Sequence, residues 1–466
     1  MQGAGHRSLL DFRAMPPTPL VPIEEMLTRL DRALAHSPAE ETEIVWIEAR
    51  RGQESNGKRR RDSFENMERT LLIRVRESGR TGLHRMSAAG LSDLENAVRE
   101  ALGQARLAPP TPPPLQPPGA AGPLPETPET AGPLFDPEVA RLVPGRARDL
   151  IQRQADRGEV AWIGWADGRV AVVNSRGLRR TAEVTTVWMV VSCGNDPGAG
   201  RTMAATRSLE ALDPVALFER ARQRHAGPGN VASIADIPRE PVPLILSPDA
   251  AAALVDLLNR YALGSVTFPS GPFRGRIGEP VCHPAITLRD EPDKGLPFPF
   301  DLFGAAKHPL ALIDRGVLVT PAVDGALAAE IGLPPTPHQV ASDEALAAHP
   351  RLQPGDEADE ELLRRADGGI WVSALDGVQA FDPGALRFRA RARGVRRIEG
   401  GALGAALPDL LWEDSLPDLL ARVLGVGRTV VSVTTGDPLL GATTSPLLAF
   451  EAVSGLRAAQ RSTPRS

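Results

Sequence analysis

The pattern of apolar and polar positions predicts a helix, a hairpin and a second helix in the first part of the chain. Residues 22–36 carry apolar side chains three and four positions apart, as on one face of an amphipathic helix. Residues 43–50 and 70–76 alternate apolar with polar side chains, which predicts strands buried on one face. A strand at 81–86 returns beside 70–76, and helical spacing resumes over 92–104.

The same order of elements is predicted again farther along the chain. Residues 145–156 predict a short helix, and residues 161–173 and 178–192 predict the two strands of a long hairpin. The Asn-Ser-Arg-Gly turn between these strands supplies residues that tolerate positive φ. An Asp-Pro pair then predicts the start of a helix over residues 213–223. The repetition lies in the order of elements, because the residues themselves do not repeat.

The chain beyond residue 237 predicts mainly strands joined by short helices. A strand at 243–246 leads into a helix over 247–261, whose first residues, Ser-Pro-Asp, favour a helix start. The same patterns predict a hairpin at 310–318, strands at 369–374, 386–398, 430–435 and 446–452, and short helices at 356–365 and 416–424. We therefore expect an α+β protein, with a small N-terminal α+β layer and a larger C-terminal domain rich in antiparallel sheet.

A proline-rich segment divides the chain. Residues 109–133 include eleven prolines, which exclude a regular helix or a central strand and favour an extended linker. The predicted boundaries are a disordered extension at 1–19, an N-terminal α+β domain at 20–108, the linker at 109–134, a central α+β domain at 135–236, a C-terminal domain at 237–456 and a tail at 457–466.

Composition and charge exclude several classes of protein. The 466 residues carry a formal net charge of −5, so we expect no nucleic-acid partner. The basic run at 58–61 has no aromatic residues within it, which favours an exposed hairpin tip. No run of 18 apolar residues and no apolar signal segment occur, so we expect a cytoplasmic protein without a membrane partner. Two cysteines exclude a disulfide framework.

No common catalytic motif occurs in the sequence. A GxGxxG after a strand, a P-loop and a GxSxG elbow are all absent. No two of the eight histidines have the close helical spacing that zinc sites use. Cys282 and His283 are adjacent and would point to opposite faces of a strand, which favours structural roles. An enzyme with a relocated site that uses Cys282, His283 or His308 stays open as an alternative.

Several segments, taken in order, resemble the TldD/PmbA family, which supplies the two subunits of the TldD/TldE metalloprotease. The sharpest similarity is the sequence Phe-Arg-Gly-Arg-Ile-Gly-Glu at 273–279. The other similar segments lie at 80–94, 174–178, 208–214, 243–252, 312–318, 354–356, 369–372 and 445–446. Together they extend over most of residues 22–456, and the resemblance implies a TldD/PmbA-like fold.

The resemblance includes one decisive departure. The TldD-type catalytic subunits carry HExxxH on the helix shortly before the segment that corresponds to 273–278, and its two histidines hold zinc while its glutamate polarises a water molecule. In an alignment without gaps, these three positions fall on Leu254, Val255 and Asn259. The predicted helix at 250–261 contains no histidine and no glutamate, so a shift in alignment does not restore the motif.

The rest of the metal site is replaced as well. The family's C-terminal cysteine position falls near Ser432, and no cysteine follows Cys282. The resemblance therefore implies the non-catalytic TldE/PmbA-type subunit, a pseudoenzyme without a metal of its own. Such a subunit forms a heterodimer with a TldD-type HExxxH subunit, which holds the zinc, and the pair acts in proteolysis or peptide maturation on unfolded peptides.

Within that resemblance, four residues are candidates for lining a peptide chamber, because they lie in or beside the degenerate motif: Asn259, Phe273, Arg274 and Arg276. Core packing for Phe273 and an ion pair for Arg276 are the simpler interpretations. A stand-alone peptide-binding or scaffolding protein is the alternative function from a different class.

Overall fold

The computed structural model describes residues 20–57, 63–87, 94–110, 124, 133–194, 199–226, 232–341, 344–434 and 436–459. The basic run at 58–61, the predicted extension at 1–19 and most of the proline-rich segment lie outside these residues.

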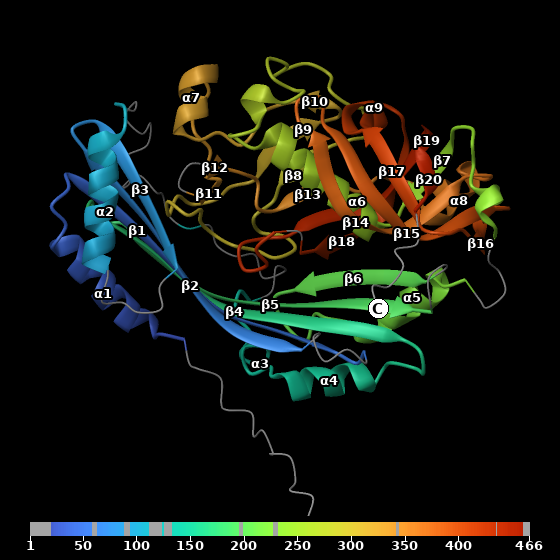
Figure 1. The fold of residues 1–466 in the computed structure, drawn as a ribbon, viewed down its shortest axis with the longest axis horizontal. Helices are drawn as coiled ribbons and strands as arrows, with labels where there is room; N and C mark the ends of the chain where they lie inside the picture. The colour runs from blue at the N-terminus through green and yellow to red at the C-terminus, as the bar shows by residue number, and fades with distance from the viewer. Residues whose placement is uncertain are drawn as a thin grey trace, which may run out of the picture.

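A six-stranded antiparallel sheet forms the first layer of the molecule (Figure 1). Its order is β3-β2-β1-β4-β5-β6. The strands are β1 (Glu41–Ser55), β2 (Phe64–Glu77), β3 (Arg80–Ser87), β4 (Val160–Asn174), β5 (Arg179–Cys193) and β6 (Gly200–Thr206). The central pair, β1 and β4, joins the residues that the sequence analysis assigned to two separate domains. Pairing between strands more than a hundred residues apart leaves no mark in a local pattern, so the sequence could not reveal this shared sheet.

Helices cover one face of this sheet. They are α1 (Ile23–Ala35), α2 (Leu94–Leu107), α3 (Pro137–Ala140), α4 (Pro144–Gln152) and α5 (Pro214–Arg224). Helices α1 and α2 pack on fully buried Trp46 and Ile73, whereas α4 and α5 pack on Trp165 and Met189. Figure 1 shows α1 and α2 beside one half of the sheet and α3 and α4 beneath the other half. The predicted repetition of elements therefore corresponds to the two halves of one layer.

A twelve-stranded sheet organises the C-terminal part of the described chain. Most pairs are antiparallel, while β7 with β14 and β13 with β19 are parallel. Its strands are β7 (Val242–Leu246), β8 (Leu288–Asp290), β9 (Leu310–Asp314), β10 (Val317–Leu318), β13 (Pro350–Leu352), β14 (Ile370–Asp382), β15 (Arg387–Glu399), β16 (Ala402–Ala406), β17 (Leu410–Ser415), β18 (Val423–Val433), β19 (Thr443–Val453) and β20 (Leu456–Ala458). The predicted α+β class with large antiparallel sheets is confirmed.

The remaining elements lie against this sheet. They are α6 (Pro248–Leu258), a π-helical turn (Asn259–Leu263), α7 (Gly325–Ile331), α8 (Asp359–Arg365), α9 (Leu416–Ala421) and a small sheet of β11 (Gln339–Ala341) and β12 (Glu344–Ala345). Ser247 caps α6 as predicted, because its hydroxyl accepts a hydrogen bond from the Ala250 backbone N–H. The helix predicted at 416–424 is too long, since Val423 already pairs with Phe450 in the sheet. Pairing between strands overrides the helical spacing at that point.

The face of the six-stranded sheet that the helices leave open packs against the C-terminal part. Val172 and Val184 from the sheet meet Phe298, Phe300 and Leu439 in one buried cluster. Apolar contact between these two layers fixes how the first sheet sits on the second. Any space left between them is therefore a defined feature of the fold.

Glu43 lies buried in this interlayer contact, and its protonation should affect stability. Its carboxylate is 3.2 Å from the Arg74 guanidinium. Burial raises the pKa of Glu43 to about 7, against the opposing effect of Arg74. The native state therefore binds a proton that the unfolded chain releases above pH 4.5, so wild-type stability falls as the pH rises from about 4.5 through 7.

The Glu43→Gln substitution mimics the protonated side chain and should remove this loss. Relative to wild type, we expect its free energy of unfolding to rise by about 2 kcal/mol between pH 5 and pH 8, because the wild-type penalty grows by about 1.4 kcal/mol for each pH unit up to the raised pKa. Urea denaturation of both proteins at the two pH values measures this. If the two proteins differ in unfolding free energy by the same amount at both pH values, the raised pKa of Glu43 is contradicted.

Candidate functional site

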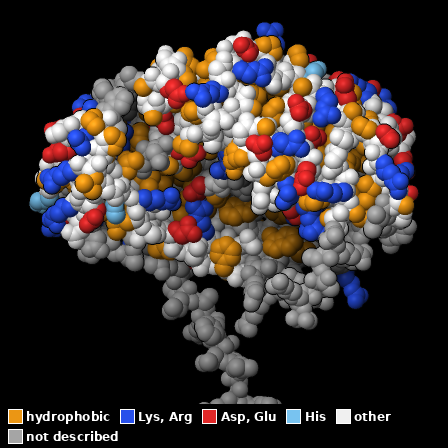
Figure 2. Space-filling view, turned by 45° about the horizontal axis from the view of Figure 1, so that its top comes forward, with side chains coloured by type: hydrophobic (Ala, Val, Ile, Leu, Met, Phe, Trp, Pro, Cys, Tyr) orange, Lys and Arg blue, Asp and Glu red, His pale blue; other side chains and the backbone are white. Residues whose placement is uncertain are grey.

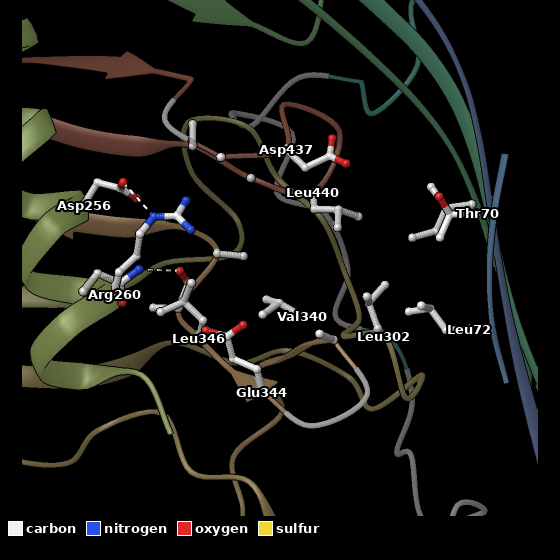
Figure 3. Close-up of a pocket in the computed structure, with 18 of the residues that line it drawn as sticks. Thr70, Leu72, Asp256, Arg260, Leu302, Val340, Glu344, Leu346, Asp437 and Leu440 are labelled. Atoms are coloured by element: carbon white, nitrogen blue, oxygen red, sulfur yellow. Dashed lines mark hydrogen bonds and ion pairs between the residues drawn. The ribbon is translucent and has the colours of Figure 1, made fainter. Parts of the chain in front are cut away.

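A cavity of about 510 Å³ lies between the open face of the first sheet and the C-terminal part (Figure 3). This volume falls within the range that small-ligand sites usually have. One wall comes from β1, β2 and β3, and the opposite wall comes from the end of α6 with the π-helical turn. Figure 3 shows Thr70 and Leu72 of β2 facing Asp256 and Arg260 across the cavity. The site therefore combines residues from both layers of the fold.

The segments at 340–350 and 436–443, together with Leu302, form the rest of the lining. Val340, Glu344 and Leu346 come from the first segment, and Leu440 comes from the second. The two segments touch closely, since a Cβ added to Gly441 would lie 1.9 Å from a backbone oxygen of the first segment. Figure 2 shows charged side chains of both signs around a hollow in the middle of the molecule, with hydrophobic side chains inside it.

The charged side chains of the cavity are mostly paired. The Arg51 guanidinium donates to both carboxylate oxygens of Asp437 at 2.9 Å and to Glu68 at 3.1 Å. Arg260 donates to Asp256 at 2.8 Å, one helical turn away. The Arg51–Asp437 pair spans from β1 to the C-terminal part, so it ties the two sides of the cavity together.

Asn259 is the buried polar residue of the helical wall. Its Nδ2 donates to the backbone oxygen of Ala347 at 2.8 Å, which orients the amide. Its Oδ1 is buried and has no hydrogen-bond partner in the described part of the chain. A buried acceptor without a donor is costly, so this amide suits a guest that supplies an N–H group.

The other two positions of the degenerate motif do not face this cavity. Leu254 and Val255 are buried among Leu288, Leu420 and Leu448 in the main C-terminal core. Zinc is held by histidine, cysteine or carboxylate side chains, so the residues at Leu254, Val255 and Asn259 do not fit that metal. Among the residues that the structure describes, no group of three histidine, cysteine or acidic side chains could hold a metal ion.

Of the four predicted chamber-lining residues, the structure places only Asn259 on the cavity. Phe273 is fully buried in the C-terminal core. Arg274 lies 3.6 Å from Glu330 and is largely exposed, and Arg276 lies 3.3 Å from Glu279. These three were chosen by their closeness to the motif in sequence. The chain turns away from the cavity after the π-helical turn, so these three residues do not line it.

Sequence reasoning missed the lining residues contributed by the first sheet. Ile47, Arg51, Thr70 and Leu72 stand about two hundred residues before α6 in the chain. Their alternation with core residues indicates that they lie on the same face of the sheet. Only the packing of one layer on the other shows that this face meets α6. No local signal could have identified them as part of the site.

A buried polar cluster supports the 340–350 wall and was also missed. Asp290 accepts hydrogen bonds from the His349 backbone N–H at 2.6 Å and lies 3.1 Å from the Nε2 atom of His338. Burial would raise the pKa of Asp290, but its hydrogen bonds with the two histidines hold it well below the ordinary value. Burial lowers the pKa of His349 to about 4, so this ring is neutral at pH 7. The cluster therefore anchors the wall.

The residues named for a relocated site do not form a reactive group. Burial raises the pKa of the Cys282 thiol to about 12, so almost no thiolate exists at neutral pH. The Nδ1 atom of His283 accepts the backbone N–H of Ala285 at 3.2 Å, which is a local turn contact. Neither Cys282, His283 nor His308 lines the cavity.

Both thiols should resist alkylation in the folded protein. Burial and the Glu159 carboxylate raise the pKa of Cys193 to about 12, as burial alone does for Cys282. At pH 7.5 we expect iodoacetamide to leave both unmodified over a time that fully alkylates free cysteine, and to modify both in 8 M urea. Mass spectrometry of the intact chain measures this. Rapid alkylation of folded Cys282 would restore the relocated site as a candidate.

The helices of the described chain give no membrane-spanning candidate: none is both long enough and apolar enough to cross a bilayer.

Comparisons with known proteins agree with the resemblance seen in the sequence. Residues 239–455 match the family model of the PmbA/TldA metallopeptidase C-terminal domain. A search of curated proteins returned no match.

Solved structures share the fold over nearly the whole chain. TldE from Thermococcus kodakarensis superposes with a TM-score of 0.73 at 20% identity, covering 92% of this chain and 100% of that one. A proposed modulator of DNA gyrase from Thermotoga maritima superposes with a TM-score of 0.74 at 19% identity, covering 92% and 99%. A second such protein, from Bacteroides thetaiotaomicron, gives a TM-score of 0.69 at 16% identity, covering 93% and 98%. Residues 239–455 therefore carry a PmbA/TldA metallopeptidase C-terminal domain, and the chain as a whole shares the fold of these solved structures.

Proposed function

We propose that this chain is a non-catalytic, TldE/PmbA-like subunit of a heteromeric TldD/TldE-type zinc metalloprotease that acts on unfolded peptides in the cytoplasm. In this proposal the zinc belongs to a TldD-type partner that carries HExxxH. The pair would degrade or mature small peptides, and this chain would act as a pseudoenzyme.

The observation that carries the proposal is the set of residues that α6 and the turn after it carry at the motif positions. The gap-free alignment places the family's zinc ligands and glutamate on this helix, where the chain has Leu254, Val255 and Asn259. Two of these side chains are core residues and the third is an amide, so none of them can activate water at a metal. The surrounding TldD/PmbA fold is nevertheless retained in full.

The cavity supports a role in holding peptide. Its sheet wall mixes apolar side chains, such as Ile47 and Leu72, with charged ones, and Arg51, Asp256 and Arg260 are held by ion pairs. An extended peptide presents alternating apolar side chains and backbone N–H groups. Asn259 can accept one such N–H, and Leu72 with Leu440 can contact apolar side chains. These residues would bind and orient the peptide, while the partner would supply the chemistry.

Co-expression with a HExxxH-bearing TldD-type protein from the same genome tests this function. We expect a tag on this chain to recover both proteins, and the pair to cleave denatured casein. Replacing the partner's motif glutamate by glutamine should abolish cleavage without dissociating the pair. The chain purified alone should not cleave casein. Cleavage by this chain alone, or no association with the partner, would contradict the proposal.

A further inference from the structure

The outer face of β15 carries a row of arginines. Arg387, Arg389, Arg391 and Arg393 occupy alternate positions, while the residues between them are buried in the C-terminal core. Alternate residues of a strand share a face and lie about 7 Å apart. The four guanidinium groups therefore form a line about 20 Å long on one side of the sheet.

Arg457 of β20 and Arg201 of β6, which is a strand of the first sheet, lie beside this row, and three carboxylates are shared among the six arginines. Glu413 of β17 binds both Arg389, at 2.7 Å, and Arg457 of β20, at 2.9 Å. Asp376 of β14 binds both Arg393, at 3.0 Å, and Arg201 of β6, at 3.3 Å. Each carboxylate thus serves two guanidinium groups.

Asp409 is the third shared carboxylate, since it binds Arg391 at 3.1 Å and also contacts Arg393. Arg387 has no ion pair among the described residues. Asp382, at the hairpin end, adds one more negative charge beside it and also caps the turn through the Ala385 N–H. Six arginines and four carboxylates leave an excess of two positive charges on this face, in a chain whose net charge is −5.

The two arginines in the middle of the row are more exposed than the carboxylates that they bind, whereas Asp376 is more exposed than Arg393 and Arg201. The Arg389 side chain is 54% exposed against 24% for Glu413, and Arg391 is 33% exposed against 11% for Asp409. A guanidinium has five N–H donors, and one carboxylate occupies at most two of them. An approaching molecule therefore meets guanidinium groups with donors still available.

An exposed aromatic ring ends the row. Phe381 is 46% exposed, and its ring centroid lies 5.8 Å from the Arg387 guanidinium and 5.6 Å from that of Arg389. Aromatic and arginine side chains are the types most enriched where proteins bind one another.

From this arrangement, we propose that the outer face of β15 is a docking site for an acidic, extended polypeptide segment of a second protein. Acidic residues at alternate positions of an extended segment repeat at about 7 Å, which is the spacing of the arginines. Bidentate arginine–carboxylate pairs would fix its register, and Phe381 would supply apolar contact at one end. The inference does not depend on any protease partner.

A polypeptide fits this face better than a nucleic acid does. The row follows a single strand, and among the described residues Phe381 is the aromatic side chain that stacks on its arginines. Nucleic-acid channels combine several stacking rings with a broad basic groove. The chain's overall negative charge would also repel a long polyanion, whereas a short acidic segment needs only the local excess.

Fluorescence anisotropy of the full chain with a labelled nine-residue peptide of alternating Glu and Thr tests the proposal. We expect binding at 20 mM salt that weakens at least tenfold at 200 mM salt. The double variant Arg387→Gln with Arg389→Gln should weaken binding at least tenfold at low salt. The matched control is Arg141→Gln with Arg146→Gln, which removes two exposed arginines paired with Glu138 on the helical side and should change binding less than twofold.

Three results would overturn the proposal. One is no binding of the acidic peptide at low salt, and another is an equal loss in both double variants. The third is tighter binding of a single-stranded 12-mer DNA than of the peptide, lost in the β15 variant, because it would identify the face as a nucleic-acid site. The same peptide with Lys in place of Glu should not bind.

Discussion

The Arg207→Met variant should lose about 4 kcal/mol of stability, the largest effect of any single substitution considered for this chain. Arg207 is fully buried where the first sheet meets the C-terminal part, and no carboxylate contacts its guanidinium directly. It donates instead to backbone oxygens of Thr185, Leu296, Pro297, Pro438 and Leu439, and to the Thr186 hydroxyl.

The size of the loss follows from what the substitution leaves behind. Methionine fills a similar volume but donates no hydrogen bonds. The buried carbonyl groups therefore lose the hydrogen bonds that Arg207 donates, at a cost of about 1–3 kcal/mol for each carbonyl that stays unsatisfied. Burial lowers the pKa of Arg207 to about 9, so the group is charged at pH 7 and held by this cage of oxygens. Removal of that desolvated charge recovers part of the cost, which keeps the net loss near 4 kcal/mol.

Urea denaturation at pH 7 measures this effect. Arg207→Lys should fall between wild type and Arg207→Met, since an ammonium has three donors instead of five. Arg141→Met is the matched control, because that arginine lies on the surface and pairs only with Glu138, so its change should stay below about 0.5 kcal/mol. A stability of Arg207→Met equal to that of the control would show that this contact does not hold the two layers together.

The Thr70→Trp variant should reduce peptide cleavage by the assembled protease about a hundredfold, which corresponds to about 2.7 kcal/mol. Thr70 lies on β2 opposite Ile47, and its side chain points into the cavity toward α6 (Figure 3). Tryptophan suits a strand and would fill much of the open space, so a peptide could no longer lie between the sheet and α6. Cleavage assays of the purified pair measure the change in kcat/KM.

Stability and assembly separate a blocked cavity from a damaged fold. The unfolding free energy of Thr70→Trp should stay within about 1 kcal/mol of wild type, because the ring enters existing space. Phe64→Trp, an exposed position on the same strand, should leave cleavage unchanged. Normal cleavage by a folded Thr70→Trp assembly would show that peptide does not pass through this cavity.

The sequence predicted elements well where local chemistry decides them. The α1 helix follows from its apolar spacing, and the α5 start follows from Asp213, whose carboxylate accepts the Ala216 N–H as a cap should. The β4–β5 hairpin follows from its turn, where Gly177 adopts φ of +91°. The boundary at Val423 failed because pairing with β19 outweighed helical spacing.

The site was less predictable than the helices and strands, because contacts between distant parts of the chain decide which residues meet there. The alignment led to Asn259, which does line the cavity, but it could not distinguish this residue from Phe273, which turns into the core. The opposite wall comes from β1 and β2, whose association with α6 depends on packing of Val172 and Leu439 between the layers. Contacts of that range carry no signature in a single sequence.

Native mass spectrometry of this chain co-expressed with a HExxxH-bearing TldD-type protein, followed by zinc analysis of the separated subunits, distinguishes a non-catalytic subunit from a protein that acts alone. We expect a stable complex that contains both chains, with zinc retained by the TldD-type protein and none by this chain. If this chain instead forms a homo-oligomer that ignores the partner, or carries stoichiometric zinc by itself, the account of a non-catalytic protease subunit is contradicted.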